Sequence, residues 1–233
     1  MYRGIYLASM GMLADITKLD TLSNNISNVD TAGYKSDSLA FKAYFEKQLY
    51  SFNPMPQKEE VEVKKIGSFE QALILDQVKT NYSQGTLEYT GHSLDFAIDG
   101  KGFFVVENAG KRMYTRAGNF KANEEGYLIT PEGYYVLGKN DQKIKLDGNV
   151  LEKLLVVALK NPRKVGYTFF KGEEVRKENF RILQGYVEKS NVNIVREMVK
   201  MIEATRHYET LSKAVTVHDE LLNKSINSAG SLK

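Results

Sequence analysis

The chain has 233 residues, of which 42% are hydrophobic and 26% are charged, and its formal net charge is +3 at pH 7. These values are ordinary for a globular protein and exclude a collagen-like or wholly disordered chain. The absence of cysteine excludes disulfides, zinc–thiolate sites and thiol catalysis, and three histidines leave little material for metal or acid–base chemistry. No apolar run approaches the roughly 20 residues that a membrane-spanning helix needs, and the first residues lack the pattern of an ordinary secretory signal.

The first segment of the chain has a seven-residue repeat of apolar side chains, which is typical of a coiled-coil helix. The repeat positions, together with the apolar residues three places after them, are Ile5, Ala8, Met12, Leu19, Leu22, Ile26 and Val29. A second apolar set lies on another face of the predicted helix and consists of Tyr6, Met10 and Leu13. The spacing therefore predicts a helix with two apolar stripes.

Three asparagines, Asn24, Asn25 and Asn28, mark the end of this helix. Asparagine is unfavourable inside helices but favours caps and turns, because its side chain competes for backbone hydrogen bonds. Gly33 can adopt the left-handed conformation that closes many helices. We therefore predict that the helix ends between Asn28 and Gly33.

The middle of the chain has a different pattern. Residues 51–68 contain two prolines and a charged run, and they predict an extended connector. From 69 to 187, short apolar and aromatic runs alternate with turn signals such as Asp99-Gly100 and Asp147-Gly148. Short strands at this spacing are typical of an all-β sandwich or barrel.

The last part of the chain repeats the helical pattern. Its apolar positions recur every seven residues, at Ile194, Met201, Tyr208, Val215 and Leu222. The residues that fill in around this repeat are Met198, Ala204, Leu211 and Ile226. A second stripe again exists and contains Val195, Val199, Ile202, Ala214, Val217 and Leu221. Because residues 193–227 contain neither proline nor glycine, we predict one long helix here.

A helix with two apolar stripes needs two partners. The first partner can be the other terminal helix of the same chain. The second has no candidate in a chain whose middle is β-rich, so we predict that it packs against neighbouring subunits. The alternative is that both stripes face one internal core.

The predicted fold is α+β: the N- and C-terminal helices pair as a coiled coil, and the central domain is all-β and sandwich- or barrel-like. The predicted divisions are the N-terminal helix and Asn-rich turn (1–50), the connector (51–68), the β-rich domain (69–187) and the C-terminal helix (188–233). The predicted subunit-interface residues are Ile5, Met12, Leu19, Asn24, Asn25, Ile26, Asn28, Ile194, Met198, Met201, Tyr208, Leu211, Val215 and Leu222. This plan suits a helical assembly, which needs head-to-tail contacts that do not close into a ring.

Candidate catalytic and ligand-binding groups are few. Gly100-Lys101-Gly102 begins a dinucleotide fingerprint, but the third glycine is missing and a strand follows, so a hairpin turn is the better interpretation. His207 and His218 lie about 16 Å apart along one predicted helix, too far to share a metal ion. Asp95 and Asp99 lie about 13 Å apart in an extended strand, outside the range of paired catalytic carboxylates. We therefore predict no catalytic, cofactor-binding or metal-binding residues.

Four stretches of the sequence form longer motifs. The first contains residues 23–28 (SNNISN) and 31–35 (TAGYK), at the end of the predicted first helix. The second is residues 94–104 (LDFAIDGKGFF), and the third begins with residues 114–120 (YTRAGNF). The fourth begins with residues 184–193 (QGYVEKSNVN) and continues into the last helix. These motifs, in this order, resemble the bacterial flagellar rod and hook family.

The resemblance implies a structural subunit without catalytic activity. In this family the terminal helices pair and pack around an axial channel, and the β-rich middle faces outward. Subunits are exported unfolded through the flagellar type III apparatus, and in species with an outer membrane they assemble in the periplasmic space. The expected partners are copies of the chain, neighbouring rod and hook proteins, and the export apparatus. No nucleic acid, small-molecule substrate, cofactor or membrane span is expected.

Within this family the chain is similar to a rod protein rather than a hook protein, because hook proteins usually carry an added outer domain. The short middle and the connector favour the proximal rod type, with the distal type as the alternative. The expected function is a subunit of the drive shaft that transmits torque and encloses the export channel. The alternatives are a coiled-coil binding or adaptor protein of the hook–basal body, and a hook-type subunit. An enzyme would need a pocket with convergent titratable groups.

Overall fold

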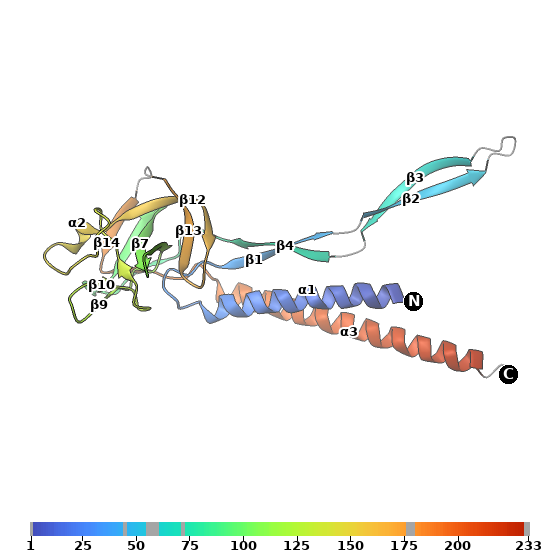
Figure 1. Ribbon diagram of the computed structural model, residues 1–233. Helices are drawn as coiled ribbons and strands as arrows, with labels where there is room; N and C mark the ends of the chain where they lie inside the picture. Colours follow the sequence, from blue (N-terminus) through green and yellow to red (C-terminus); the bar gives the residue numbers. More distant parts are fainter. Residues whose placement is uncertain (1, 44–45, 55–60, 71–72, 176–179, 231–233) are drawn as a thin grey trace. The chain divides into compact units, whose positions relative to one another are not determined.

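The computed structural model describes residues 2–43, 46–54, 61–70, 73–175 and 180–230. The fold is α+β, as predicted, with a helix at each end of the chain and β-structure between them (Figure 1). The chain divides into two compact units. Unit 1 contains Met1–Ser23, Ser38–Lys79 and Met198–Lys233, and unit 2 contains Asn24–Asp37 and Thr80–Glu197.

The two long helices are α1 (Tyr2–Ser27) and α3 (Ile194–Gly230). Within unit 1 they run antiparallel, so the start of α1 and the end of α3 lie at the same end of the pair (Figure 1). α1 ends at Ser27, directly before the predicted range of 28–33. Gly33 does have the left-handed φ of +68°. It lies six residues beyond the end of α1, however, and therefore does not cap this helix.

Unit 1 also contains two antiparallel strand pairs. β1 (Asp37–Ala43) pairs with β4 (Leu73–Thr80), and β2 (Glu46–Pro54) pairs with β3 (Val61–Glu70). β2 and β3 pair from Glu46↔Glu70 to Pro54↔Val61, with one irregularity between Leu49 and Tyr50. The structure thus differs from the predicted connector over 51–68, because most of its described residues form paired strands. The alternation of Val61, Val63 and charged residues suits a strand.

Unit 2 is built on a sheet of seven strands that partly closes on itself. Its strand order is β12-β13-β8-β7-β11-β10-β9, and β12 also pairs with β7. The four strands β7, β8, β13 and β12 therefore form a closed ring, which gives the predicted barrel-like arrangement. In chain order the strands are β7 (Phe103–Asn108), β8 (Lys111–Thr115), β9 (Lys121–Ala122), β10 (Leu128–Ile129), β11 (Tyr135–Val136), β12 (Val156–Lys164) and β13 (Phe169–Val175).

The core of unit 2 lies on both sides of β7, because successive strand residues point to opposite faces. Phe104 and Val106 belong to a large cluster with Phe96 and Leu128. Phe103 belongs, with Val105, to a second cluster that also contains Tyr114 and Phe170. This continuous apolar run is what a strand buried on both faces requires.

The remaining strands of unit 2 form two short pairs. β5 (Leu87–Tyr89) pairs with β15 (Tyr186–Glu188), and β6 (Phe96–Gly100) pairs with β14 (Phe180–Gln184). A single helical turn, α2 (Val150–Lys153), precedes β12. Gly100, with φ of +117°, turns the chain from β6 into β7, and these two strands belong to different sheets. The predicted hairpin at Gly100-Lys101-Gly102 is therefore wrong, although the prediction of a turn is confirmed.

Candidate assembly interface

Helices α1 and α3 meet along a close seam in unit 1. His207 Nδ1 lies 2.6 Å from Asp15 Oδ2. A Cβ atom added to Gly11 would lie 2.7 Å from Leu211 Cδ1, and one added to Gly4 would lie 2.9 Å from His218 Nε2. The residue numbers of each of these three pairs add up to 222, which is the constant sum expected of a regular antiparallel pair. The two glycines therefore leave room for the ends of the Leu211 and His218 side chains in the seam.

The predicted seven-residue repeats lie along this seam. Ala8, Leu22 and Ala204 are fully buried. The predicted repeat residues that are half-buried in the single chain are Ile5, Met12, Leu19, Ile26, Met201, Tyr208, Leu211, Val215 and Leu222. Their spacing of three and four residues places them on one stripe of each helix. One apolar stripe of each helix is thus used to pair α1 with α3.

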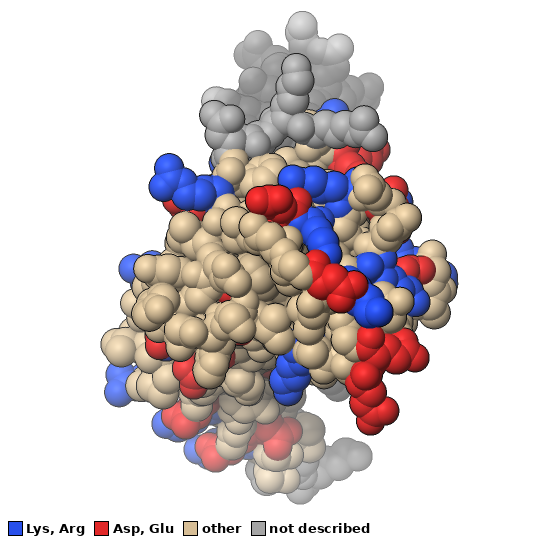
Figure 2. Space-filling view, turned by 90° about the vertical axis from the view of Figure 1, so that its left-hand side faces the viewer, with Lys and Arg blue, Asp and Glu red and all other residues tan. Residues whose placement is uncertain are grey.

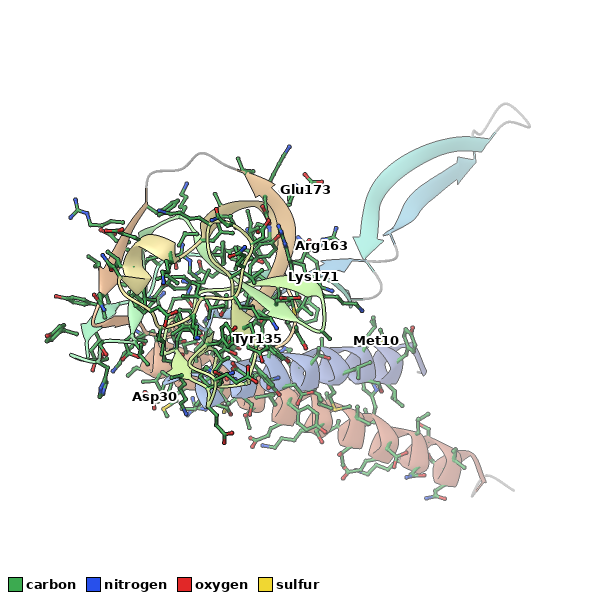
Figure 3. The ribbon with its side chains drawn as sticks, turned by 60° about the vertical axis from the view of Figure 1, so that its left-hand side comes forward. Met10, Asp30, Tyr135, Arg163, Lys171 and Glu173 are labelled. Atoms are coloured by element: carbon green, nitrogen blue, oxygen red, sulfur yellow. The ribbon has the colours of Figure 1, made fainter. Side chains whose placement is uncertain are left out.

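A second apolar stripe on each helix is left largely exposed by the described residues of the chain. On α1 it contains Leu13, which is 58% exposed, and on α3 it contains Val195, which is 67% exposed. The other large exposed apolar residues of the two helices are Tyr6, Ile16, Ile194, Met198, Val199, Ile202, Val217, Leu221 and Ile226. Met10, which was predicted for this stripe of α1 and is labelled in Figure 3, is half-buried. The predicted interface residues Ile194 and Met198 are 39% and 46% exposed, although Ile194 is the first position of the repeat that forms the seam.

The Asn-rich turn is stabilised by contacts inside unit 2. Asn25 is 1% exposed, and its Oδ1 accepts hydrogen bonds from the Tyr34 hydroxyl (3.2 Å) and the Asp37 N–H (3.0 Å). Its Nδ2 donates to the Asp37 carbonyl oxygen (2.8 Å) and to Glu197 Oε2 (3.0 Å). All the hydrogen-bonding capacity of this buried amide is therefore used within the chain.

The other two asparagines of the predicted interface, Asn24 and Asn28, are less buried than Asn25. Asn28 Nδ2 donates to the Asn24 carbonyl oxygen at 2.8 Å, and Asn28 Oδ1 accepts from the Thr31 hydroxyl at 3.2 Å. Asn24 itself is exposed. Asn25 and Asn28 thus shape the turn, and Asn24 is left at the surface.

A buried ionic cluster, which we name the Glu188 cluster, joins three of the sequence motifs in unit 2. Lys35 Nζ lies 2.5 Å from Glu188 Oε1, and Arg116 Nη1 lies 3.1 Å from Glu188 Oε2. The side chains of Lys35 and Glu188 are fully buried, and that of Arg116 is 4% exposed. Backbone groups complete the cluster: Gly85 N–H donates to Glu188, and carbonyl oxygens of Ser83, Ile98 and Gly100 accept from the two cations.

Burial shifts the pKa values of residues in and beside the Glu188 cluster. It lowers the pKa of Lys35 and of Arg116, while the negative charge of Glu188 opposes both shifts. Burial also raises the pKa of Tyr34 to about 12, helped by the negative charge of Asp37. Lys164 lies on the other side of this tyrosine, 3.8 Å from its ring centroid and 2.8 Å from Asp37 Oδ2.

The sequence does not predict the Glu188 cluster, although each of its three charged residues lies in one of the four motifs. Lys35 ends the TAGYK motif, Arg116 lies in YTRAGNF, and Glu188 lies in QGYVEKSNVN. The available signal was a charged residue inside each otherwise polar or apolar motif. Gly33 lies beside this cluster, and its N–H donates to the Glu188 carbonyl oxygen at 2.7 Å. An added Cβ on Gly33 would clash with the backbone at Arg116 and Ala117.

The residues weighed for chemistry have structural contacts. His207 contacts Asp15 and His218 lies against Gly4, both in the seam. Asp95 Oδ2 accepts a hydrogen bond from the Thr90 hydroxyl at 2.6 Å. Among the described residues there is no group of three or more histidine or acidic side chains that could hold a metal ion. None of the described helices is long and apolar enough to cross a membrane.

Three segments of the chain match known protein families. Residues 5–35 match the family described as "Flagella basal body rod protein". Residues 97–157 match "Flagellar hook protein FlgE/F/G D1 domain", and residues 183–228 match "Flagellar basal body rod FlgEFG protein C-terminal". These segments contain the seam helices, the core of unit 2 and Glu188.

Relatives match the chain over nearly its whole length. The flagellar basal-body rod protein FlgG of Bacillus subtilis is 28% identical, covering 97% of this chain and 99% of its own. FlgG of Borreliella burgdorferi is 30% identical over 97% of this chain and 98% of its own. FlgF of Caulobacter vibrioides is 28% identical over the full length of both chains. The chain therefore belongs to the flagellar basal-body rod protein family, and is a structural component of the basal body of the bacterial flagellum.

Proposed function

We propose that this rod protein polymerises through the exposed stripes of α1 and α3, and that the polymer is the drive shaft that transmits torque and encloses the export channel. The observation that carries the proposal is the concentration of uncovered apolar surface on these two helices. They hold eleven of the seventeen large apolar residues that are exposed in the described part of the chain. Contiguous apolar surface of this kind marks a protein–protein contact.

The seam supports the same proposal, because it shows which stripe is already used. Asp15, Leu211 and Ala204 lie between the two helices of one chain. Leu13 and Val199, on the other stripe, are 58% and 50% exposed. Each of these partly exposed apolar side chains that becomes buried contributes up to about 1.5–3 kcal/mol, so stacking of copies is favoured.

Membership in the rod family supports the other parts of the proposal. The partners are copies of the chain, neighbouring rod and hook proteins, and the flagellar type III export apparatus, and the chain has no catalytic role. The short middle of the chain favours a place in the proximal rod, with the distal rod as the alternative. Electron micrographs of basal bodies purified with and without the gene test this placement, because the rod should stop close to its base when the gene is absent. A rod that stops only near the hook would instead place the chain in the distal rod.

A substitution in the exposed stripe tests polymerisation. Val199→Asp places a charge on the stripe without touching the seam, so the chain should keep its helix content by circular dichroism and lose assembly by sedimentation. Ser212→Asp, at an exposed polar position of the same helix, is the matched control and should assemble like the parent chain. Leu19→Asp, in the seam, should lower helix content as well, because it buries an unpaired charge.

Two results would contradict the proposal. Normal assembly of Val199→Asp would show that the stripe is not an interface between copies. A small closed oligomer in which both stripes are buried would instead support a coiled-coil adaptor protein, which does not need head-to-tail growth.

A further inference from the structure

The segment of unit 2 between β11 and α2 forms a basic surface that the helix stripes do not include. Lys143 and Lys145 are exposed on either side of Ile144, which is 3% exposed, as the alternation of an extended segment requires. They line a groove of about 440 Å³, which we name the basic groove. The charged residues that line it are Lys139, Lys143, Lys145, Glu152 and Lys153.

Contacts inside unit 2 hold two of these lysines in place. Lys143 Nζ lies 3.7 Å from the ring centroid of Tyr135, which is labelled in Figure 3. Lys153 Nζ donates to the carbonyl oxygens of Asp147 and Lys145. Neither contact neutralises a positive charge. Like charges held together on a hollowed surface repel one another, so a negatively charged partner is favoured there.

A second groove of unit 2 has the opposite charge. It has a volume of about 460 Å³, and we name it the acidic groove. The charged residues that line it are Asp30, Glu88, Asp95, Glu132 and Lys189. Four carboxylates and one lysine give this groove a formal charge of −3, and four lysines and one glutamate give the basic groove +3. The two grooves share no lining residue.

Most of the charged side chains that line the acidic groove are accessible to solvent. Glu88 Oε2 lies 2.5 Å from Lys189 Nζ, and both side chains are about half exposed. Asp30 and Glu132 are exposed. Asp30 belongs to the Asn-rich turn region and is labelled in Figure 3. Figure 2 shows that, on one face of the molecule, charged side chains lie mostly around an uncharged centre. Exposed charges guide the approach of a partner of opposite charge.

We propose that the basic groove of one copy binds the acidic groove of a second copy. A helical assembly requires a contact that joins two different surfaces of the same subunit. The opposite formal charges of the two grooves, −3 and +3, meet this requirement. The inference rests on the proposed function, because it presumes stacked copies, and it adds a contact between β-rich units. Complementary charges fix the register and speed of association more than its strength.

Cross-linking between introduced cysteines tests this contact directly, because the chain has no cysteine of its own. One full-length variant carries Lys145→Cys and another carries Glu132→Cys. Mixed at low salt under oxidising conditions, they should form a disulfide-linked dimer about ten times faster than the control mixture. In the control, Lys111→Cys replaces Lys145→Cys, since Lys111 is an exposed lysine of β8 outside both grooves. High salt should reduce the difference by screening the charges.

Equal cross-linking rates in the two mixtures would overturn the inference. A charge exchange gives a second test: Lys143→Glu with Lys145→Glu should slow assembly, and adding Glu88→Lys with Glu132→Lys in the same chain should restore it. Failure of the second pair to restore assembly would also contradict the contact. The Val199→Asp variant distinguishes the helix-stripe contact from the groove contact. Normal assembly of this variant would contradict polymerisation through the stripes, whereas the cross-linking rates test the groove contact separately.

Discussion

Glu188 lies where three distant parts of the sequence meet in unit 2. Its carboxylate accepts hydrogen bonds from Lys35, Arg116 and the Gly85 N–H. Backbone carbonyl oxygens of Ser83, Ile98 and Gly100 accept further hydrogen bonds from the two buried cations, which helps a single carboxylate to hold them. Removal of the carboxylate would leave both cations buried without a counter-charge.

Glu188→Ala should therefore lower the free energy of unfolding of unit 2 by about 3–5 kcal/mol, the usual cost of breaking a buried ion pair on one side. Urea unfolding followed by tyrosine fluorescence measures it. Glu88→Ala is the matched control, because Glu88 pairs with Lys189 at the surface. It should cost less than about 1 kcal/mol. Equal losses in the two variants would show that the Glu188 cluster carries no special stability.

Tyr34 predicts how stability depends on alkaline pH. Its pKa is raised from 10.0 to about 12 in the folded chain. An unfolded tyrosine loses its proton near pH 10 while the folded one keeps it, so rising pH favours the unfolded state across this window. Thermal melting should show stability falling between pH 10 and 12. Tyr34→Phe loses the hydrogen bond to Asn25 but should show a smaller fall, and an unchanged fall would contradict this assignment.

These contacts between residues cannot be predicted from the sequence, although the motifs that contain them can be recognised in it. Lys35, Arg116 and Glu188 are widely separated along the chain, and sequence spacing cannot show which charges become neighbours. The Asn-rich turn was partly predicted, because asparagine favours turns. The full burial of Asn25 and its bond to Glu197 depend on how two distant segments pack.

At the scale of elements, local periodicity predicted the helices well. The seven-residue repeats through Leu19 and Met201 predicted both α1 and α3, and their half-buried positions define the seam. Pro54, Pro56 and a charged run predict a connector, whereas the structure has the paired strands β2 and β3 in this region. The sequence predicts a sandwich or barrel for the middle of the chain, but it does not predict which strands pair. The closed ring of β7, β8, β13 and β12 depends on pairings between distant segments.

At the scale of the whole molecule, the two units should differ in their stability as a single copy. Unit 2 has a large apolar core and a buried ionic cluster, so it should be stable in a single copy. The helix pair of unit 1 should be less stable than unit 2. Its seam includes the polar pair of Asp15 and His207 and two glycines, Gly4 and Gly11. Polar residues in a coiled-coil seam fix its register at a cost in stability.

Hydrogen exchange of backbone amides, in dilute single copies and in the assembled form, tests the central claim most directly. The uncovered stripes predict that α1 and residues 195–226 exchange quickly in the dilute chain and become strongly protected on assembly, while the β-strands of unit 2 are protected in both states. Strong protection of both terminal helices in the dilute single copy would contradict the account, because the helices would then need no neighbour.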